Sequence, residues 1–234
     1  MLKVINFHKS YGKKEVVKGI NLEVKPGEIF GFVGHNGAGK TTTIKSIVGI
    51  LPFEKGTILI DGKDIVKNPV ECKKVISYIP DNPDIYEHMT GLNYLKFIAS
   101  IFEMDKDYFN KKVEELSKEF EIYSNLGDQI KSYSHGMKQK LVIISALMHN
   151  PKLLIFDEPF VGLDPKASFT LKKLMKELCS NGSSIFFSSH VLEVVEKLCD
   201  YVAIIKDGII VVQGETEDIL KDNKSLEDIF LELE

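Results

Sequence analysis

The sequence contains no arginine, because all 30 basic residues among its 234 are lysine. The chain therefore cannot supply an arginine finger to a phosphoryl-transfer site, nor the two-pronged arginine contact that commonly reads guanine. The formal net charge of −4 also argues against a protein that binds nucleic acid. We expect no nucleic-acid partner.

Cysteine and long apolar runs are scarce as well. Cys72, Cys179 and Cys199 lie far apart and form no C-x-x-C pair, which is typical of a reducing cytosol. No apolar run approaches the roughly 18 residues that span a bilayer. The lysine-rich N-terminus also lacks the apolar core of a signal peptide. If the protein works at a membrane, we expect another chain to hold it there.

The most informative stretch that is present runs from Ile29 to Thr43. An apolar segment is followed by a glycine-rich turn and then by apolar residues at helical spacing. The turn carries the pattern Gly34-x-x-x-x-Gly39-Lys40-Thr41, which in this context predicts a phosphate-binding P-loop. Glycines let backbone N–H groups approach an anion. We expect Lys40 to contact the β- and γ-phosphates and the Thr41 hydroxyl to bind Mg²⁺.

Short apolar segments flank this loop. Leu2–Phe7, Glu15–Val24 and Gly56–Ile60 are separated by turns and are typical of strands. We expect an antiparallel sheet beside the P-loop strand. Tyr11 follows the first segment, where its ring could stack on adenine, and an ordinary core or surface tyrosine is the alternative.

The middle of the chain changes character. After an expected strand at Val75–Ile79, the prolines of Pro80-Asp81-Asn82-Pro83 predict an irregular loop. Apolar residues then recur at helical spacing, so we expect a helical subdomain at 84–150, inserted into a core made of 1–83 and 151–234. We expect its stripes to pack in the core, with a partner docked on exposed aromatics as the alternative. The stripes are Leu95, Ile98, Ile101 and Phe102, followed by Phe109, Val113, Leu116 and Phe120.

An apolar run at Leu153–Phe156 ends in Asp157 and Glu158. Four apolar residues in a row favour a strand buried on both faces of a parallel sheet. Buried charge is unfavourable unless it is paired or coordinated. Beside a P-loop, we therefore expect this pair at the Mg²⁺ end of the site, and a solvated turn is the alternative.

Two further helices have recognisable starts. Ser134 is suited to cap one helix, and Asp164 followed by Pro165 is suited to cap another. A strand at Ser184–Ser188 then leads to Ser189 and His190, and Asp207-Gly208 predicts a hairpin. Two short helices are expected to close the chain, the last carrying Leu226, Ile229, Phe230 and Leu233.

The order of these motifs resembles the nucleotide-binding subunit of an ABC transporter over essentially the whole chain. Its fold would be α/β, a P-loop NTPase (RecA-like) core with an antiparallel β-subdomain and an inserted α-helical subdomain. The matches are Gly34–Thr42 to Walker A, Asp81 to the Q-loop, Ser134–Met137 to the signature loop, Leu153–Glu158 to Walker B, Gly162-Leu163-Asp164 to the D-loop and His190 to the switch histidine.

The resemblance implies ATP and Mg²⁺ as cofactors and ATP hydrolysis as the activity. Glu158 would be the general base, and His190 and Lys40 would contact the phosphates. Mg²⁺ would be held by Thr41 and Asp157, with Asp81 as a further candidate. The expected ATP-binding residues are Tyr11, Gly34, His35, Asn36, Gly37, Ala38, Gly39, Lys40, Thr41 and Thr42.

Signature and D-loop residues of this family act on the ATP of an opposite subunit. The resemblance therefore implies a homodimer that closes around ATP and a separate integral membrane permease as partner. It also implies a peripheral location on the cytoplasmic side of the cell membrane. The residues assigned to the partner's site are Ser134, His135, Gly136, Met137 and Asp164.

Two residues depart from the usual family pattern. His135 stands where the signature has glycine, and its ring either turns away from the phosphate, which we favour, or helps to hold it. Asp81 stands where glutamine is usual, so its role as a metal ligand is open and Asn82 could compensate. Both resemble ATPases paired with ABC-2-type permeases, which favours an exporter. The alternatives are a soluble ABC-type ATPase acting on nucleic acid or ribosomes, and a P-loop kinase.

Overall fold

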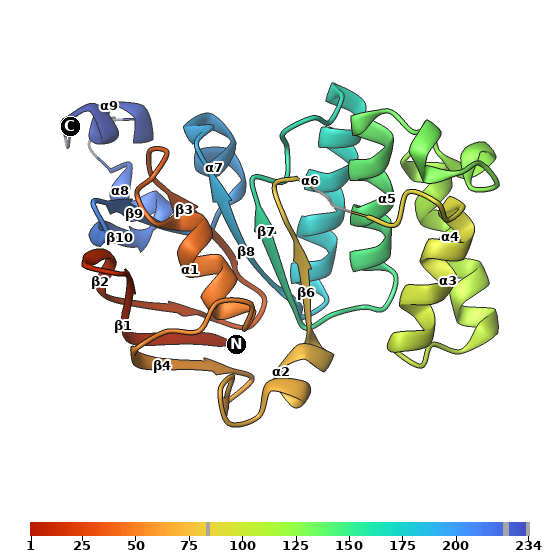
Figure 1. Cartoon of the computed structure of the whole chain (residues 1–234). Helices are drawn as coiled ribbons and strands as arrows, with labels where there is room; N and C mark the ends of the chain where they lie inside the picture. The colour runs from red at the N-terminus through yellow and green to blue at the C-terminus, as the bar shows by residue number, and fades with distance from the viewer. Residues whose placement is uncertain (83–84, 222–224, 233–234) are drawn as a thin grey trace.

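The structure, a computed structural model, describes residues 1–82, 85–221 and 225–232, and it contains two sheets (Figure 1). The smaller sheet is antiparallel with the order β2-β1-β4-β5. The larger sheet has the order β10-β9-β3-β8-β7-β6 and is parallel except where β10 pairs with β9. The strands are β1 (Leu2–Tyr11), β2 (Lys14–Val24), β3 (Ile29–Val33), β4 (Lys55–Ile60), β5 (Lys63–Asp64), β6 (Ile76–Ile79), β7 (Leu153–Asp157), β8 (Ser184–Ser189), β9 (Tyr201–Lys206) and β10 (Ile209–Glu215).

The helices flank these sheets, with α1 beside both sheets and α3 and α4 at the far edge, beyond α5 (Figure 1). Their bounds are α1 (Lys40–Ile47), α2 (Pro69–Val75), α3 (Gly91–Ile101), α4 (Lys106–Glu119), α5 (His135–Leu147), α6 (Pro165–Ser180), α7 (Leu192–Leu198), α8 (Thr216–Ile219) and α9 (Leu226–Glu232), with 3₁₀ turns at Tyr123–Asn125 and Ile130–Ser132. Across the described ranges, no helix has both the length and the apolar character that a membrane crossing requires.

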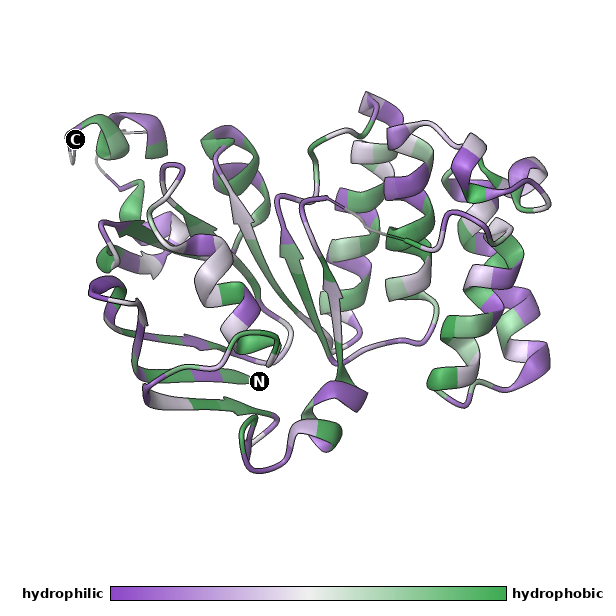
Figure 2. Cartoon of the chain, in the orientation of Figure 1, coloured by the Kyte–Doolittle hydropathy of each residue, from purple (hydrophilic) through white to green (hydrophobic). Residues whose placement is uncertain are grey.

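Two buried clusters hold these layers together. One lies between the two sheets and includes Phe30, Phe32 and Phe186, with α1 packed into it. The other joins the opposite face of the large sheet to α5, α6 and the apolar stripes of α3 and α4. Figure 2 shows apolar residues along the central strands and alternating polar and apolar surfaces on the outer helices. The central strands β3 and β7 are buried at every position, as their continuous apolar runs predict.

The elements predicted from sequence are largely confirmed, with two corrections. The strand expected from Val75 starts at Ile76, because Pro69–Val75 forms a short helix with proline at its first turn. Ile101, the last residue of α3, is 57% exposed and does not pack in the core. Pro83 and Leu233, and residue 84 at the start of the expected helical subdomain, lie outside the part of the chain that the structure describes.

Side chains fix the starts of α5 and α6 as expected. The Ser134 hydroxyl accepts a hydrogen bond from the Met137 N–H at 3.3 Å. The Asp164 carboxylate accepts one from the Ala167 N–H at 2.8 Å. Since β7 ends at Asp157 and α6 begins at Pro165, the short segment that joins them follows directly on the end of β7.

Candidate functional site

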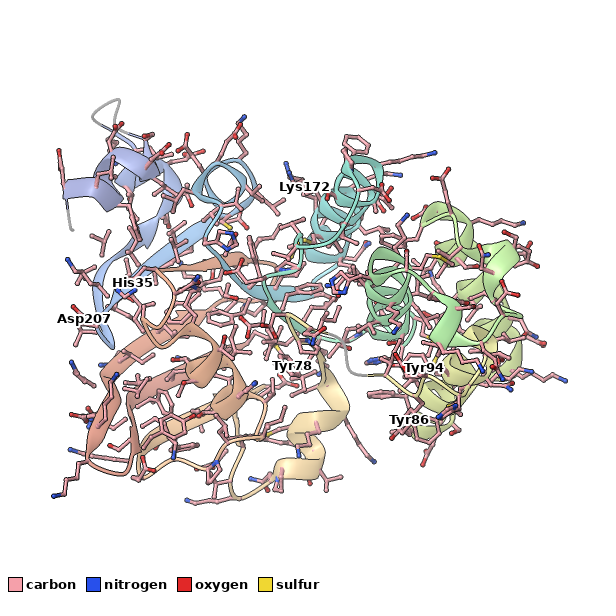
Figure 3. The ribbon with its side chains drawn as sticks, turned by 45° about the horizontal axis from the view of Figure 1, so that its top comes forward. His35, Tyr78, Tyr86, Tyr94, Lys172 and Asp207 are labelled. Atoms are coloured by element: carbon pink, nitrogen blue, oxygen red, sulfur yellow. The ribbon has the colours of Figure 1, made fainter. Side chains whose placement is uncertain are left out.

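A pocket of about 390 Å³ opens at the carboxyl ends of β3 and β7. Its walls come from the antiparallel sheet, the loop before α1 and the ends of two parallel strands, which is where ligands bind in sheets of this kind. Figure 3 shows His35 on that loop. The pocket is lined by Tyr11, Val16, His35, Asn36, Gly37, Gly39, Lys40, Thr41, Thr42, Asp81, Asp157 and Glu158.

The loop before α1 requires glycine at defined positions. Gly37 and Gly39 have φ angles of 86° and 111°, which side chains rarely tolerate. A Cβ at Gly34 would lie 2.4 Å from the carbonyl oxygen of Ile205, so no other residue fits there. Gly39 caps α1, whose free N–H groups therefore point toward the loop. Gly34 and Ala38 shape this loop without lining the pocket.

Lys40 places a buried cation against the loop. Its side chain is only 7% exposed, and its Nζ donates hydrogen bonds to the carbonyl oxygens of Gly34 at 2.6 Å and His35 at 3.3 Å. The same Nζ lies 3.8 Å from Oε1 of Glu158. Burial lowers the pKa of Lys40, while the carboxylates of Glu158 and Asp157 work in the opposite direction.

Asp157 is the acid that fits a metal ion. Its Oδ1 accepts a hydrogen bond of 2.6 Å from the Ser188 hydroxyl, whereas Oδ2 is buried and has no hydrogen-bond partner among the described residues. Burial raises the pKa of Asp157, and the side chains of Ser188 and Thr41 oppose that shift. A buried carboxylate oxygen left free beside a threonine hydroxyl suits Mg²⁺, which prefers oxygen ligands.

No group of three or more His, Cys, Asp and Glu side chains in the described ranges could hold a metal by itself. Mg²⁺ is commonly bound through one or two carboxylates together with substrate phosphates. Asp81 lines the same pocket, and its Oδ1 accepts a hydrogen bond from the Asn82 N–H at 2.9 Å. Asn82 does not line the pocket.

Glu158 is held in an unusual backbone conformation at the edge of the pocket. Its φ of 54° is rare for a residue other than glycine. The Ser188 hydroxyl accepts the Glu158 N–H at 3.1 Å. The side-chain oxygen Oε2 of Glu158 lies 2.9 Å from the ring nitrogen Nδ1 of His190, and it also accepts a hydrogen bond from the backbone N–H of His190 at 3.3 Å. The carboxylate is thus aimed and held, with a histidine on one side and Lys40 on the other.

Two contributors to this site were missed from the sequence. Ser188 binds both Asp157 and Glu158, and it stands opposite Asp157 in the register of β7 and β8. A small polar residue at the end of an apolar strand is a signal that could have found it, since the carboxyl ends of parallel strands meet at one edge. Val16 of β2 also lines the pocket, and its apolar character gave no signal.

The residues of the signature and the D-loop form a separate group. None of Ser134, His135, Gly136, Met137 and Asp164 lines the pocket. Asp164 forms a 2.6 Å ion pair with Lys140 of α5, and this interaction lowers the pKa of Asp164. Within one chain, therefore, the structure joins Walker A, Walker B, Asp81 and His190, and it leaves the signature residues outside that pocket.

Three features together define a P-loop NTPase. They are a glycine-rich loop that joins a central parallel strand to a helix, a buried lysine on that helix, and an acid at the end of a neighbouring strand. Comparison with known proteins narrows that class, because residues 17–161 match the family described as ABC transporter. The chain belongs to the ABC transporter family, as one of its ATP-binding and ATP-hydrolysing proteins.

Curated relatives and a solved structure match nearly the whole of this chain. The chain is 37% identical to the linearmycin resistance ATP-binding protein LnrL of Bacillus subtilis, over 94% of this chain and 70% of that protein. It is 34% identical to the ABC-type transporter ATP-binding protein EcsA of the same organism, over 100% of this chain and 96% of that protein. A solved ATP-binding subunit of an ABC transporter matches it with a TM-score of 0.95 and 32% identity, covering 100% of this chain and 99% of the other.

Proposed function

We propose that this chain is the ATP-driven subunit of an exporter, in which two copies close around ATP and move a separate membrane permease. One observation carries this proposal. Lys40, Asp157 and Glu158 reach the same pocket from two different elements, and His190 is hydrogen-bonded to Glu158. Phosphoryl transfer needs positioning and charge neutralisation more than covalent help, and this set can supply both.

In the proposed reaction, the loop N–H groups and Lys40 bind the β- and γ-phosphates. Glu158 accepts a proton from the attacking water as general base, and His190 holds the Glu158 carboxylate and contacts the γ-phosphate. Thr41 and Asp157 would hold Mg²⁺, which supplies positive charge to the phosphate oxygens. Asp81 lies close enough to the pocket to serve as an additional, outer contact.

The signature residues are proposed to complete the site of a second copy. Ser134 caps α5, so the first N–H groups of that helix face outward from a partly exposed helix end. A phosphate held by another subunit could bind there. Loss of the γ-phosphate on hydrolysis would remove this contact and let the dimer open, which provides the mechanical step.

The chain is proposed to divide into a core, 1–83 with 151–234, and a helical subdomain, 84–150. The membrane partner is proposed to dock on the helical part, at the cytoplasmic side of the membrane. Tyr86 is 61% exposed, Phe97 38% and Ile101 57%. The Tyr86 and Phe97 rings meet edge to face at 5.7 Å, and Tyr86 lies at the outer side of the molecule (Figure 3). Exposed apolar patches of this kind mark interaction sites.

Export is supported by the likeness to LnrL, whose name assigns it to resistance against linearmycin. The alternative, a soluble ATPase of nucleic acid or ribosomes, has less support, because the chain is acidic and lacks arginine. Isolation of the full chain from native membranes tests the proposal, with the co-purifying membrane protein identified by mass spectrometry. A ribosome or a nucleic acid in its place would favour the alternative.

Docking of the permease on Tyr86 and Phe97 predicts that removal of both rings weakens permease binding. The double variant Tyr86→Ala, Phe97→Ala should retain ATP binding, because neither ring lines the pocket, and should recover at least about tenfold less permease, since interface aromatics are often hot spots. Tyr108→Ala, which removes a 40% exposed tyrosine from α4, is the matched control. Equal permease recovery from the double variant and the control would place the docking surface elsewhere.

Tyr11 is proposed to stack on adenine. Its ring is 50% exposed at the pocket, and Nζ of Lys9 lies 5.3 Å from the ring centroid. Tyr11→Ala should weaken ATP binding by about 1–3 kcal/mol, and Tyr11→Phe should retain most of the affinity because its ring remains. Titration calorimetry with ATP measures both. Unchanged affinity in Tyr11→Ala would remove the stacking assignment.

A further inference from the structure

The segment between Glu158 and α6 contacts the start of α5 through the exposed side chain of His135, which does not line the pocket. A Cβ built on Gly162 would lie 2.6 Å from Cδ2 and 2.8 Å from Nε2 of His135, so the imidazole ring is packed directly against the Gly162 backbone. Gly162 has a φ of 80°. A Cβ on Gly136 would in turn lie 3.0 Å from the Gly162 carbonyl oxygen. A side chain at 162 would therefore displace the ring, and one at 136 would crowd the Gly162 carbonyl oxygen.

A second tie joins the same two segments one turn further along. The 2.6 Å ion pair between Lys140 and Asp164 links α5 to the first residue before α6. Toward the active site, the Val161 N–H donates to the Glu158 carbonyl oxygen at 3.2 Å, and the Leu163 N–H donates to that of Phe160 at 3.4 Å. Two successive hydrogen-bonded turns thus connect Glu158 to Gly162.

We propose that His135 is a positioning residue, whose ring holds the Gly162 loop so that the start of α5 and the turn carrying Glu158 move together. The inference rests on the proposed function, in which the start of α5 meets the ATP of a second copy. Closure on that ATP would then set the Glu158 carboxylate of the same chain. Histidine, at a position where glycine is usual in the family, thereby couples two active sites and does not need to touch phosphate.

A double-mutant cycle on the full chain tests this role, with wild type, His135→Ala, Gly162→Ala and the combination. Gly162→Ala would separate the ring from the loop, and it should lower kcat for ATP at least about tenfold with KM changed less than about twofold. His135→Ala should lower kcat by about threefold with KM unchanged. The combination should be no slower than His135→Ala beyond the strain of alanine at positive φ, since the clash is gone.

That strain is measured by a matched control. Gly62 has a φ of 77°, and a Cβ there would meet nothing within 4 Å, so Gly62→Ala adds the same backbone strain without a clash. Melting temperatures of the same variants need no nucleotide and test the contact independently. Gly162→Ala should melt several degrees below Gly62→Ala, and His135→Ala should remove that difference.

Three results would overturn the inference. They are multiplicative losses in the kinetic cycle, a melting difference that persists without the ring, and a raised KM with unchanged kcat in His135→Ala, which would make His135 a phosphate contact. Each of these results can be obtained while the wild-type chain hydrolyses ATP as the proposed function requires. Failure of the proposed function looks different, because hydrolysis would then be insensitive to the Glu158 carboxylate.

Discussion

Glu158→Gln is expected to bind ATP with near wild-type affinity while turnover falls by about 10²–10⁴-fold, the usual contribution of a general base. The substitution keeps the size of the side chain and its ability to accept one hydrogen bond from His190. In the unmodified chain, Oε2 of Glu158 lies 2.9 Å from Nδ1 of His190. The substitution removes the carboxylate that would take the proton from water. Because the γ-phosphate is no longer lost, the variant should accumulate as an ATP-bound dimer. Phosphate release and size-exclusion chromatography with ATP measure the two effects.

Glu193→Gln is the control for this prediction. Glu193 belongs to α7, shortly after His190, and its 77% exposed side chain pairs with Lys197 at 2.7 Å. Its neutralisation should leave both turnover and dimerisation unchanged. Normal hydrolysis by Glu158→Gln would refute the general-base assignment, and a monomer in saturating ATP would refute the proposed closure around nucleotide.

Much of the fold could be predicted because the apolar pattern of each central strand indicates how it is buried. The runs at Ile29–Val33 and Leu153–Phe156 are apolar without alternation, and only strands covered on both faces tolerate that pattern. The short helix Pro69–Val75 was missed because it buries only Cys72, so its sequence shows no apolar stripe. Ile101 shared the spacing of a stripe and lies in α3, yet it is 57% exposed, because spacing alone does not tell which part of a helix another element covers.

The candidate site was predictable to the extent that it is local in sequence. The P-loop is one continuous segment, and each glycine has a steric reason that a pattern can record. Ser188 was not predictable in this way, because its role arises from register between β7 and β8, 31 residues after Asp157. The contact of His135 with Gly162 joins two separate motifs, and no spacing rule within either motif contains it.

Lys40→Ala is expected to weaken ATP binding about 100-fold, which corresponds to about 3 kcal/mol, because it removes charge-assisted hydrogen bonds to two phosphates. The effect should be larger than for an exposed lysine, since Lys40 is 7% exposed and its charge acts in a poorly solvated site. Its removal also deprives the Gly34 carbonyl oxygen of the Lys40 hydrogen bond, whereas the His35 carbonyl oxygen keeps the Ala38 N–H at 3.2 Å. Titration calorimetry with ATP and Mg²⁺ measures the change in Kd.

Lys45→Ala is the matched control, because Lys45 lies on the same helix, α1, and does not line the pocket. It removes the same charge from the chain, so a general electrostatic effect would appear equally in both variants. A circular dichroism melt separates lost binding from lost folding. If Lys40→Ala stays folded and binds ATP as tightly as Lys45→Ala, then Lys40 does not bind phosphate, and its buried ammonium serves only to hold the carbonyl groups of the loop.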